Sequence, residues 1–400
     1  MFNRGLALIA VAALLPSALM ASPAESWNLF ALDGKNNIMD EEHFGIVNGK
    51  ITAGVNYRTI GSLHGLWAPP YVSSDFALDV RFFGESVAAT QYIWRPIEVE
   101  REATVKNVEI HERITLLEGE RAAVFMLTCT TRGTEPVSIP VEISLSGTLD
   151  KVPTWEFARA ESHTAARTEA AGSQIRKIQG ECGITAQTND PAFVWNAEKS
   201  CGSCTLSLAP NETRNIFIVV AMGEGSYTEE ACARIVPQSC ILASNTRRAF
   251  VQRVDDIFTK LPRFESDNPA LTAFYNRSLV HLLTNRWDVP EFVLHPYYGT
   301  GSVKGGCVCN YLWNFGETWE LLPLYDPQAV REHIKQFLQV DITTHFAFLP
   351  VTGEAFGPWY PVNQEKIIGL IYYYVKNTGD TAFLKDTVNG KTVLEWVVVN

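Results

Sequence analysis

The chain has 400 residues, so at roughly 150 residues per domain we expect two or three domains. Apolar residues make up 46% of the sequence, which excludes a disordered chain. There are 33 basic and 44 acidic residues, and the resulting net charge of −11 argues against a nucleic-acid-binding protein.

The first 24 residues have the layout of a secretory signal peptide. Arg4 gives a short basic start, an apolar run over 6–15 follows, and small residues allow cleavage after Ala21 or Ala24. That run is shorter than the roughly 20 residues needed to cross a bilayer, and no later segment is long and apolar enough. We therefore expect an exported protein, periplasmic or extracellular, without a membrane span. An N-terminal membrane anchor is the alternative.

Export makes the eight cysteines informative, because disulfides persist outside the cytoplasm. Cys307 and Cys309 flank a single valine, and the region 182–240 holds five more: Cys182, Cys201, Cys204, Cys232 and Cys240. We expect one or two disulfides in that region, with the pairing left open. A zinc site made by the last four of these five is the alternative, although the spacing between Cys232 and Cys240 is not typical of zinc ligands. We expect no metal and no cofactor.

Residues 46–222 have the pattern of strands. Alternating apolar segments lie at 105–117, 122–129, 137–145 and 215–221, and short turns such as Glu118-Gly119-Glu120 join them. Strands of this length at regular spacing predict an antiparallel β-sandwich domain over 25–240. The residue pattern becomes typical of helices at 229–260, and we assign 241–263 to a helical linker.

From residue 264 onward the pattern predicts helices. Asn268-Pro269 has the form of an N-cap with proline in the first turn, and further helices are predicted at 311–324, 327–345 and 362–376, with a fifth starting at 381–384. Helical hairpins with long loops at one end fit an α/α toroid. Only about five helices fit into 264–400, whereas a six-hairpin barrel needs twelve. We therefore expect an incomplete barrel and a chain that is a fragment of a longer protein.

The most informative stretch for function is 305–320. A glycine-rich loop runs into a predicted helix that presents Tyr311, Trp313, Asn314 and Glu317. Rings such as Trp313 stack on sugars, and a carboxyl beside an apolar ring is suited to act as a general acid. The alternative is purely structural, with Asn314 and Glu317 forming a capping box at the helix start.

A second loop leads into the helix predicted at 362–376 and supports a sugar pocket. Trp359 and Tyr360 are candidates for stacking on a ring, Asn363 and Gln364 for binding hydroxyl groups, and His345 precedes them. The alternative is a rigid, proline-bounded loop with core aromatic residues and Asn363 as an N-cap.

The loop at 286–298 adds two further candidates for substrate binding, Arg286 and Trp287. Arg286 and Asp288 are alternatively a structural ion pair, and we expect His295 to be a loop histidine rather than a ligand. Serine-hydrolase, P-loop, dinucleotide-binding and zinc-protease motifs are missing from the sequence.

The run Leu312-Trp313-Asn314-Phe315-Gly316, followed by Tyr325-Asp326-Pro327, resembles glycoside hydrolase family 63 and the wider six-hairpin glycosidases. In that family the run reads Leu-Trp-Asp-Glu-Gly-Phe, and the next helix ends in an aromatic-Asp-Pro. The resemblance covers 268–380 and implies a β-sandwich followed by an (α/α)6 toroid. It also implies that Trp313 forms a pocket wall and that Asn314 occupies the general-acid position. An amide cannot serve as that acid, so Glu317, one turn away, is the replacement candidate.

The sequence therefore predicts an exported, inverting glycoside hydrolase that acts on an oligo- or polysaccharide. A non-catalytic carbohydrate-binding protein is the first alternative, favoured by Asn314. A polysaccharide lyase is the second, with Tyr298, Tyr360 or His345 as the base. The sequence does not identify the sugar, the oligomeric state or the second carboxylate that an inverting hydrolase needs to activate water.

Overall fold

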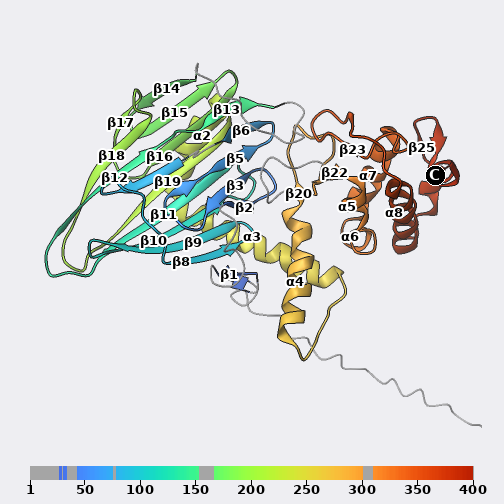
Figure 1. Cartoon of the computed structure of the whole chain (residues 1–400), viewed down its shortest axis with the longest axis horizontal. Helices are drawn as coiled ribbons and strands as arrows, with labels where there is room; N and C mark the ends of the chain where they lie inside the picture. The colour runs from blue at the N-terminus through green and yellow to red at the C-terminus, as the bar shows by residue number, and fades with distance from the viewer. Residues whose placement is uncertain are drawn as a thin grey trace, which may run out of the picture.

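The computed structural model describes residues 27–28, 30–33, 43–74, 78–152, 166–300 and 310–399. Figure 1 shows a large region of sheets formed by the N-terminal half, a helical part formed by the C-terminal half, and α3 and α4 between them. The predicted signal peptide at 1–24 lies outside the described residues, as do Cys307 and Cys309.

One antiparallel sheet of nine strands forms the larger layer, in the order β1-β8-β9-β10-β11-β19-β16-β15-β14. Its strands are β1 (Leu32–Asp33), β8 (Gln91–Arg95), β9 (Glu98–Val105), β10 (Val108–Leu116), β11 (Ala122–Thr131), β14 (Arg167–Ala171), β15 (Gln174–Gln179), β16 (Cys182–Thr188) and β19 (Thr213–Glu224).

Two five-stranded sheets complete the sandwich, in the orders β17-β18-β12-β7-β4 and β13-β6-β5-β3-β2. Their strands are β2 (His43–Val47), β3 (Thr52–Asn56), β4 (Ser62–Leu63), β5 (Gly65–Ala68), β6 (Tyr71–Ser74), β7 (Leu78–Phe82), β12 (Val137–Ser144), β13 (Thr148–Lys151), β17 (Val194–Asn196) and β18 (Cys201–Leu208). The alternation along β12 buries Ile139, Val141 and Ile143 in the shared core, so the prediction of an antiparallel sandwich is confirmed.

A fully buried ion pair joins two strands to a loop inside the sandwich. Arg101 on β9 and Glu112 on β10 are both 0% exposed, and the Arg101 Nε donates to a Glu112 carboxylate oxygen at 2.5 Å. The second carboxylate oxygen accepts from the backbone N–H of Gly61 at 2.7 Å, and the guanidinium also donates to backbone carbonyls of the 56–62 loop. Because its hydrogen bonds reach both strands and the loop, this pair fixes the loop against the sheet.

The helical segment after the sandwich begins earlier than the linker expected at 241–263. Strand β19 ends at Glu224, and α2 (Gly225–Ile235), the 3₁₀ turn η1 (Val236–Gln238) and α3 (Ser239–Lys260) follow directly. Helix α2 packs on the nine-stranded sheet through Ala231, Cys232 and Ile235.

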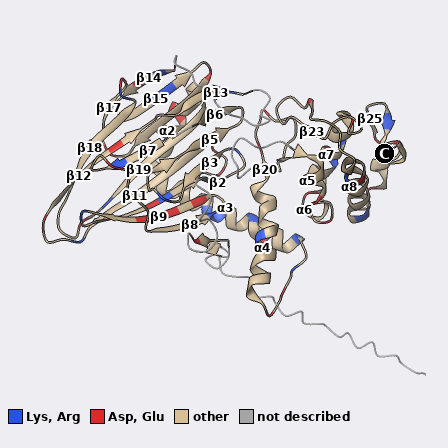
Figure 2. Cartoon of the chain, viewed as in Figure 1, with Lys and Arg blue, Asp and Glu red and all other residues tan. Residues whose placement is uncertain are grey.

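Helix α3 is bound to the sandwich by charge and by apolar contact. The Arg247 Nε donates to the buried Glu98 carboxylate of β9 at 2.9 Å, and Figure 2 shows acidic residues on β9 and basic residues on α3. Further along α3, Phe250 and Ile257 share one buried cluster with Val47 and Ile97 of the sandwich. The sandwich and the helices therefore have a continuous core where they meet.

The remaining helices and short strands form the helical part. Its helices are α4 (Pro269–Thr284), α5 (Leu312–Gly316), α6 (Leu322–Tyr325), α7 (Pro327–Gln339), α8 (Val362–Thr378), η3 (Thr381–Lys385) and α9 (Val393–Val399). Its strands are β20 (Arg286–Trp287), β21 (Tyr297–Tyr298), β22 (Asn310–Tyr311), β23 (Ala347–Phe348), β24 (Ala355–Phe356), β25 (Thr387–Val388) and β26 (Lys391–Thr392). None of the helices in the described ranges is long and apolar enough to cross a membrane.

Some helix ends follow the sequence signals and others do not. The Asn268 side chain accepts from the Ala270 N–H at 3.0 Å, so the predicted cap of α4 is confirmed. The helix predicted at 327–345 ends at Gln339 instead, because Asp341 has a left-handed backbone with φ of 57°. The fifth helix expected at 381–384 is only the 3₁₀ turn η3.

The single helix predicted at 311–324 is wrong. Residues Asn310 and Tyr311 form β22, the short helix α5 ends at Gly316, and α6 starts near Pro323 after a break. Pro323, in the first turn of α6, favours the start of a new helix there. The capping-box alternative is also wrong, because Tyr311 is the N-cap of α5 and Glu317 is its C-cap.

The expected disulfides at 182–240 are not formed. All six described cysteines are free thiols, and Cys201 and Cys204 lie three residues apart on β18. Three residues of extended strand span about 10 Å, beyond the reach of a disulfide. Burial raises the pKa of the Cys182 and Cys232 thiols to about 12. Within the described part of the chain, no three His, Cys, Asp or Glu side chains form a metal site, so the zinc alternative is not supported.

We predict that Glu112→Gln destabilises the protein strongly, because it leaves the Arg101 guanidinium buried without a counter-charge. The expected loss is about 3–5 kcal/mol in urea unfolding monitored by circular dichroism. Glu109→Gln is the matched control on the same strand, since Glu109 pairs with Arg132 at the surface. Its expected loss is below about 1 kcal/mol. Equal losses in the two variants would contradict the assigned role of the buried pair.

Candidate functional site

A small three-stranded sheet positions the residues of the candidate site. Tyr311 on β22 pairs with Ala347 on β23, and Ala347 pairs with Phe356 on β24. Next to the ladder, the Leu312 N–H donates to the Phe346 carbonyl at 3.0 Å. These bonds bring the start of α5, which carries Trp313, against the segment around Phe346.

Four rings gather there, and we call Tyr311, Trp313, Phe346 and Tyr360 the aromatic surface. The Phe346 ring lies 5.1 Å from that of Tyr311 and 5.8 Å from that of Trp313, with interplanar angles of 18° and 9°. Tyr360 lies 4.9 Å from Trp313 and is 37% exposed, and the neighbouring Trp359 is 41% exposed. Phe346 is only 8% exposed and lies against the partly exposed rings of Tyr311 and Trp313. Partly exposed aromatic rings suit stacking on the apolar face of a sugar.

The two residues proposed for catalysis flank this surface but differ in their surroundings. The Trp313 indole N–H donates to the side-chain oxygen of Asn314. The Glu317 side chain is 69% exposed, and its carboxylate lies 2.7 Å from the Lys366 ammonium. An exposed, ion-paired carboxylate lacks the apolar enclosure typical of a general acid.

Contacts with Trp319 and Gly316 hold the Lys366 side chain in place. Its side chain is only 8% exposed, and the ammonium lies 4.4 Å from the centre of the Trp319 ring. A side chain at Gly316 would meet the Lys366 stem, since a Cβ there would lie 2.7 Å from it. Helices α5 and α8 therefore pack closely where Lys366 reaches Glu317.

The amide predicted to bind hydroxyl groups at 363 has a structural partner. Asn363 is 0% exposed, and its side-chain N–H donates to the His345 carbonyl at 3.0 Å. The predicted N-cap role is wrong, because Pro361 caps α8. The His345 ring contacts the Thr344 hydroxyl at 2.8 Å, and Gln364 is partly buried. Asn363 thus ties α8 to the segment that carries Phe346.

Arg286 and Trp287 belong to a different part of the fold. Trp287 is 0% exposed and packs on Phe292, with ring centres 6.2 Å apart. The expected ion pair between Arg286 and Asp288 is not seen among the described residues, because Asp288 faces His295 at 3.7 Å. Trp287 is therefore a core residue, and Arg286 lines a cavity that shares no residue with the aromatic surface.

A buried histidine, absent from the sequence predictions, organises the core below the site. The His333 Nε2 accepts from the Tyr298 backbone N–H at 3.1 Å, while Nδ1 lies 2.8 Å from the Ala329 carbonyl, so Nδ1 carries the proton. The Phe315 ring stacks on His333 at 4.8 Å. Burial lowers the pKa of His333 to about 4, and the ring is therefore neutral near pH 7.

The Tyr325-Asp326-Pro327 motif has a structural role. The Asp326 carboxylate accepts from the Ala329 N–H at 3.2 Å, which caps α7, and from the Tyr298 hydroxyl at 3.0 Å. Burial and the nearby Asp326 hold the pKa of Tyr298 well above its ordinary value. A protonated, buried phenol is a poor base, so Tyr298 gives little support to the lyase alternative.

Two residues of the site were missed in the sequence, and each left a signal. Phe346 starts an alternating Phe-Ala-Phe run that indicates a strand. Lys366 lies on the same face of α8 as Asn363, Ile367 and Leu370, which are buried. A lysine in such a stripe needs a partner, and here the partner is Glu317.

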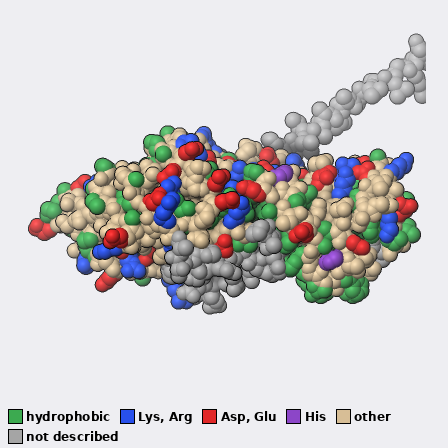
Figure 3. Space-filling model, turned by 90° about the horizontal axis from the view of Figure 1, so that it is seen from above, with side chains coloured by type: hydrophobic (Ala, Val, Ile, Leu, Met, Phe, Trp, Pro, Cys, Tyr) green, Lys and Arg blue, Asp and Glu red, His purple; other side chains and the backbone are tan. Residues whose placement is uncertain are grey.

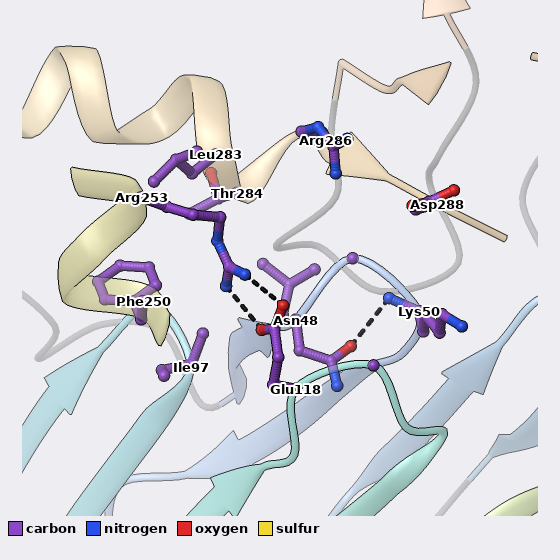
Figure 4. Close-up of a pocket in the computed structure, with 13 residues that line it drawn as sticks. Asn48, Lys50, Ile97, Glu118, Phe250, Arg253, Leu283, Thr284, Arg286 and Asp288 are labelled. Carbon is purple, nitrogen blue, oxygen red and sulfur yellow. Dashed lines mark hydrogen bonds and ion pairs between the residues drawn. The ribbon is translucent and has the colours of Figure 1, made fainter. Parts of the chain in front are cut away.

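A separate cavity of about 90 Å³ lies where the sandwich meets the helices, and Figure 4 shows the side chains around it. The Asp288 N–H donates to the Gly49 carbonyl at 2.8 Å, which joins the two parts beside the cavity. Gly49 has φ of +87°, and a Cβ there would lie 2.8 Å from the Arg286 carbonyl. Only glycine fits this close approach without strain.

Comparison with known proteins supports the fold. No protein-family model matches the sequence, and no curated protein sequence matches it. A protein from the human microbiome described as a kojibiose phosphorylase aligns over 92% of this chain and 58% of its own, with a TM-score of 0.60 and 12% identity. A bacterial glucoamylase solved with acarbose aligns over 84% and 55%, with a TM-score of 0.57 and 9% identity.

At identities of 12% and 9%, this likeness establishes the fold alone. The predicted order of a β-sandwich followed by a helical part is confirmed, and the (α/α)6 toroid stays a prediction. The chain spans little more than half the length of either neighbour.

We predict that His333 makes stability depend on pH. Its pKa falls from 6.5 in the unfolded chain to about 4 in the fold, so its contribution is complete above pH 6.5 and is lost as the pH falls towards 4. The expected loss between pH 7 and pH 5 is about 2 kcal/mol in urea unfolding. His333→Gln, which retains hydrogen-bonding groups but does not titrate there, should lose that slope. An unchanged slope in this variant would refute the assignment.

Proposed function

We propose that this chain is a carbohydrate-active protein that binds an oligo- or polysaccharide on the aromatic surface. The observation that carries this proposal is the set of nearly parallel rings of Tyr311, Trp313 and Phe346. The likeness in fold adds support, because both compared neighbours are named for enzymes that act on carbohydrates. Figure 3 shows acidic and basic side chains interspersed on the face that it displays, without the continuous basic patch expected for nucleic acid.

The first candidate reaction is inverting hydrolysis of a glycosidic bond, with Glu317 as the acid in place of Asn314. The position of Glu317 supports this candidate, because it lies directly after α5, four residues from Trp313, and its side chain is 69% exposed. Inversion also needs a second carboxylate roughly 6.5–9.5 Å away to activate water. Membership of glycoside hydrolase family 63 stays a prediction from the sequence motif.

The second candidate function is sugar binding without catalysis. Two observations favour it. Asn314, an amide, stands at the position of the family's general acid, and the Glu317 carboxylate is paired with the Lys366 ammonium. In this case the rings would still bind sugar and no bond would be broken.

We also propose that the protein is exported, on the composition of residues 1–24. The amino-terminal sequence of the protein recovered from the cell envelope or the medium tests this directly. An uncut N-terminus on protein retained in the cytoplasm would refute export.

We predict that Trp313→Ala weakens sugar binding at least about tenfold, because it removes the largest ring of the aromatic surface. The measurement is isothermal titration with a panel of α- and β-linked oligosaccharides. Tyr372→Ala is the control, since Tyr372 is 57% exposed on α8 and is not part of the aromatic surface. Sugar affinity that Trp313→Ala leaves intact would argue against the proposed surface.

We predict that Glu317→Gln separates the two candidate functions. If Glu317 is the acid, the variant should lose at least about 100-fold in kcat while it still binds the sugar. Reducing-end release from the same panel measures kcat, and ultraviolet absorbance of an unsaturated product would reveal a lyase instead. Binding without any product in the wild-type chain would establish the non-catalytic function.

A further inference from the structure

The cavity at the junction of the sandwich and the helices lies apart from the aromatic surface. Its lining comes from the loop after β2, the Glu118-Gly119 turn, α3, the end of α4 and β20. The lining residues used below are Val47, Asn48, Lys50, Ile97, Glu118, Phe250, Arg253, Leu283, Arg286 and Asp288. A ligand in this cavity would touch both parts of the molecule at once.

Several polar groups of the lining are already paired. The Asn48 amide donates to the carbonyls of Leu117 and Glu120, and its oxygen accepts from the Lys50 N–H at 2.8 Å. Arg253 donates twice to the Glu118 carboxylate, with one of the contacts at 2.8 Å. Because these groups already have hydrogen-bond partners, we do not expect them to bind a ligand.

Two basic side chains of the cavity lining have no partner among the described residues. The Arg286 guanidinium and the Lys50 ammonium, both half-buried, have no hydrogen bond or ion pair with any described residue. Of the two carboxylates in the lining, Glu118 is bound by Arg253, and Asp288 lies 3.7 Å from the His295 ring. Lys50, Arg253 and Arg286 against Glu118 and Asp288 leave the lining with one net positive charge. An anion would find two unpaired donors there.

The rest of the wall is apolar. Val47, Ile97, Phe250 and Leu283 are all at least 91% buried and belong to the cluster that joins the two parts. At roughly 10–15 Å³ for each water-sized position, about 90 Å³ accommodates a ligand of some six to nine non-hydrogen atoms. The cavity therefore offers charge on one side and an apolar pocket on the other.

We propose that this cavity binds a small organic carboxylate. The carboxylate accepts from the Arg286 guanidinium, which suits two parallel hydrogen bonds, and from the Lys50 ammonium. The apolar body lies against Phe250 and Leu283. Because Lys50 belongs to the sandwich and Arg286 to the helical part, the bound anion bridges the junction and stabilises it.

Butyrate is a suitable probe for this site, tested on the full chain by isothermal titration and by thermal unfolding. Phosphate and chloride at equal ionic strength serve as comparison anions. We expect saturable binding of butyrate with a rise in Tm, and weaker effects of the other two anions. Arg286→Gln should weaken butyrate binding at least about tenfold and Lys50→Gln about threefold.

Arg248→Gln is the matched control, because Arg248 is exposed on α3 and contacts the Asn245 side chain. It should leave butyrate binding unchanged. Circular dichroism without butyrate shows that each variant is folded, and Lys50→Gln carries the test if Arg286→Gln unfolds. No saturable binding to the wild type, wild-type affinity in both variants, or equal affinity for phosphate would each overturn the proposal.

Discussion

The burial of Glu98 under α3 is the constraint on which the arrangement of the whole chain depends. The Glu98 side chain is 0% exposed, and Arg247 reaches it from α3, while Arg95 and Arg113 approach from the sheet. A buried carboxylate that loses its cation costs several kcal/mol, so α3 is held in one place on the sandwich. The helices from α4 onward come after α3 in the chain. The position of α3 on the sandwich therefore also determines where the candidate site lies relative to the sheets (Figure 1).

Local patterns were sufficient to predict the sandwich and most of the helix starts. A strand such as β12 alternates because one face meets the other sheet, and that period is visible in any five or six residues. The cap at Asn268 and the start of α7 after Asp326 depend on side chains within three residues of the helix. Such features need no knowledge of distant contacts.

The candidate site was predicted only in part, because its geometry depends on contacts between distant residues. Tyr311 and Trp313 were found by their type, yet Phe346, the central ring, directly precedes β23, which pairs with β22 more than thirty residues away in sequence. The expected continuous helix at 311–324 failed because Tyr311 gains ladder bonds in β22 that a helix would not provide. Asn363 was expected to bind substrate hydroxyl groups, whereas its side-chain N–H donates to the His345 carbonyl. Each of these outcomes is decided by a partner that local spacing does not reveal.

The free, buried thiols have a consequence for how the protein is produced and labelled. Thiol–disulfide exchange needs the thiolate, and a pKa of about 12 leaves almost none at neutral pH for Cys129, Cys182 or Cys232. Disulfides among the six described cysteines therefore contribute nothing to the stability of the described fold. Cys240, the one exposed cysteine among those described, lies near the start of α3 and is then the natural attachment point for a fluorophore.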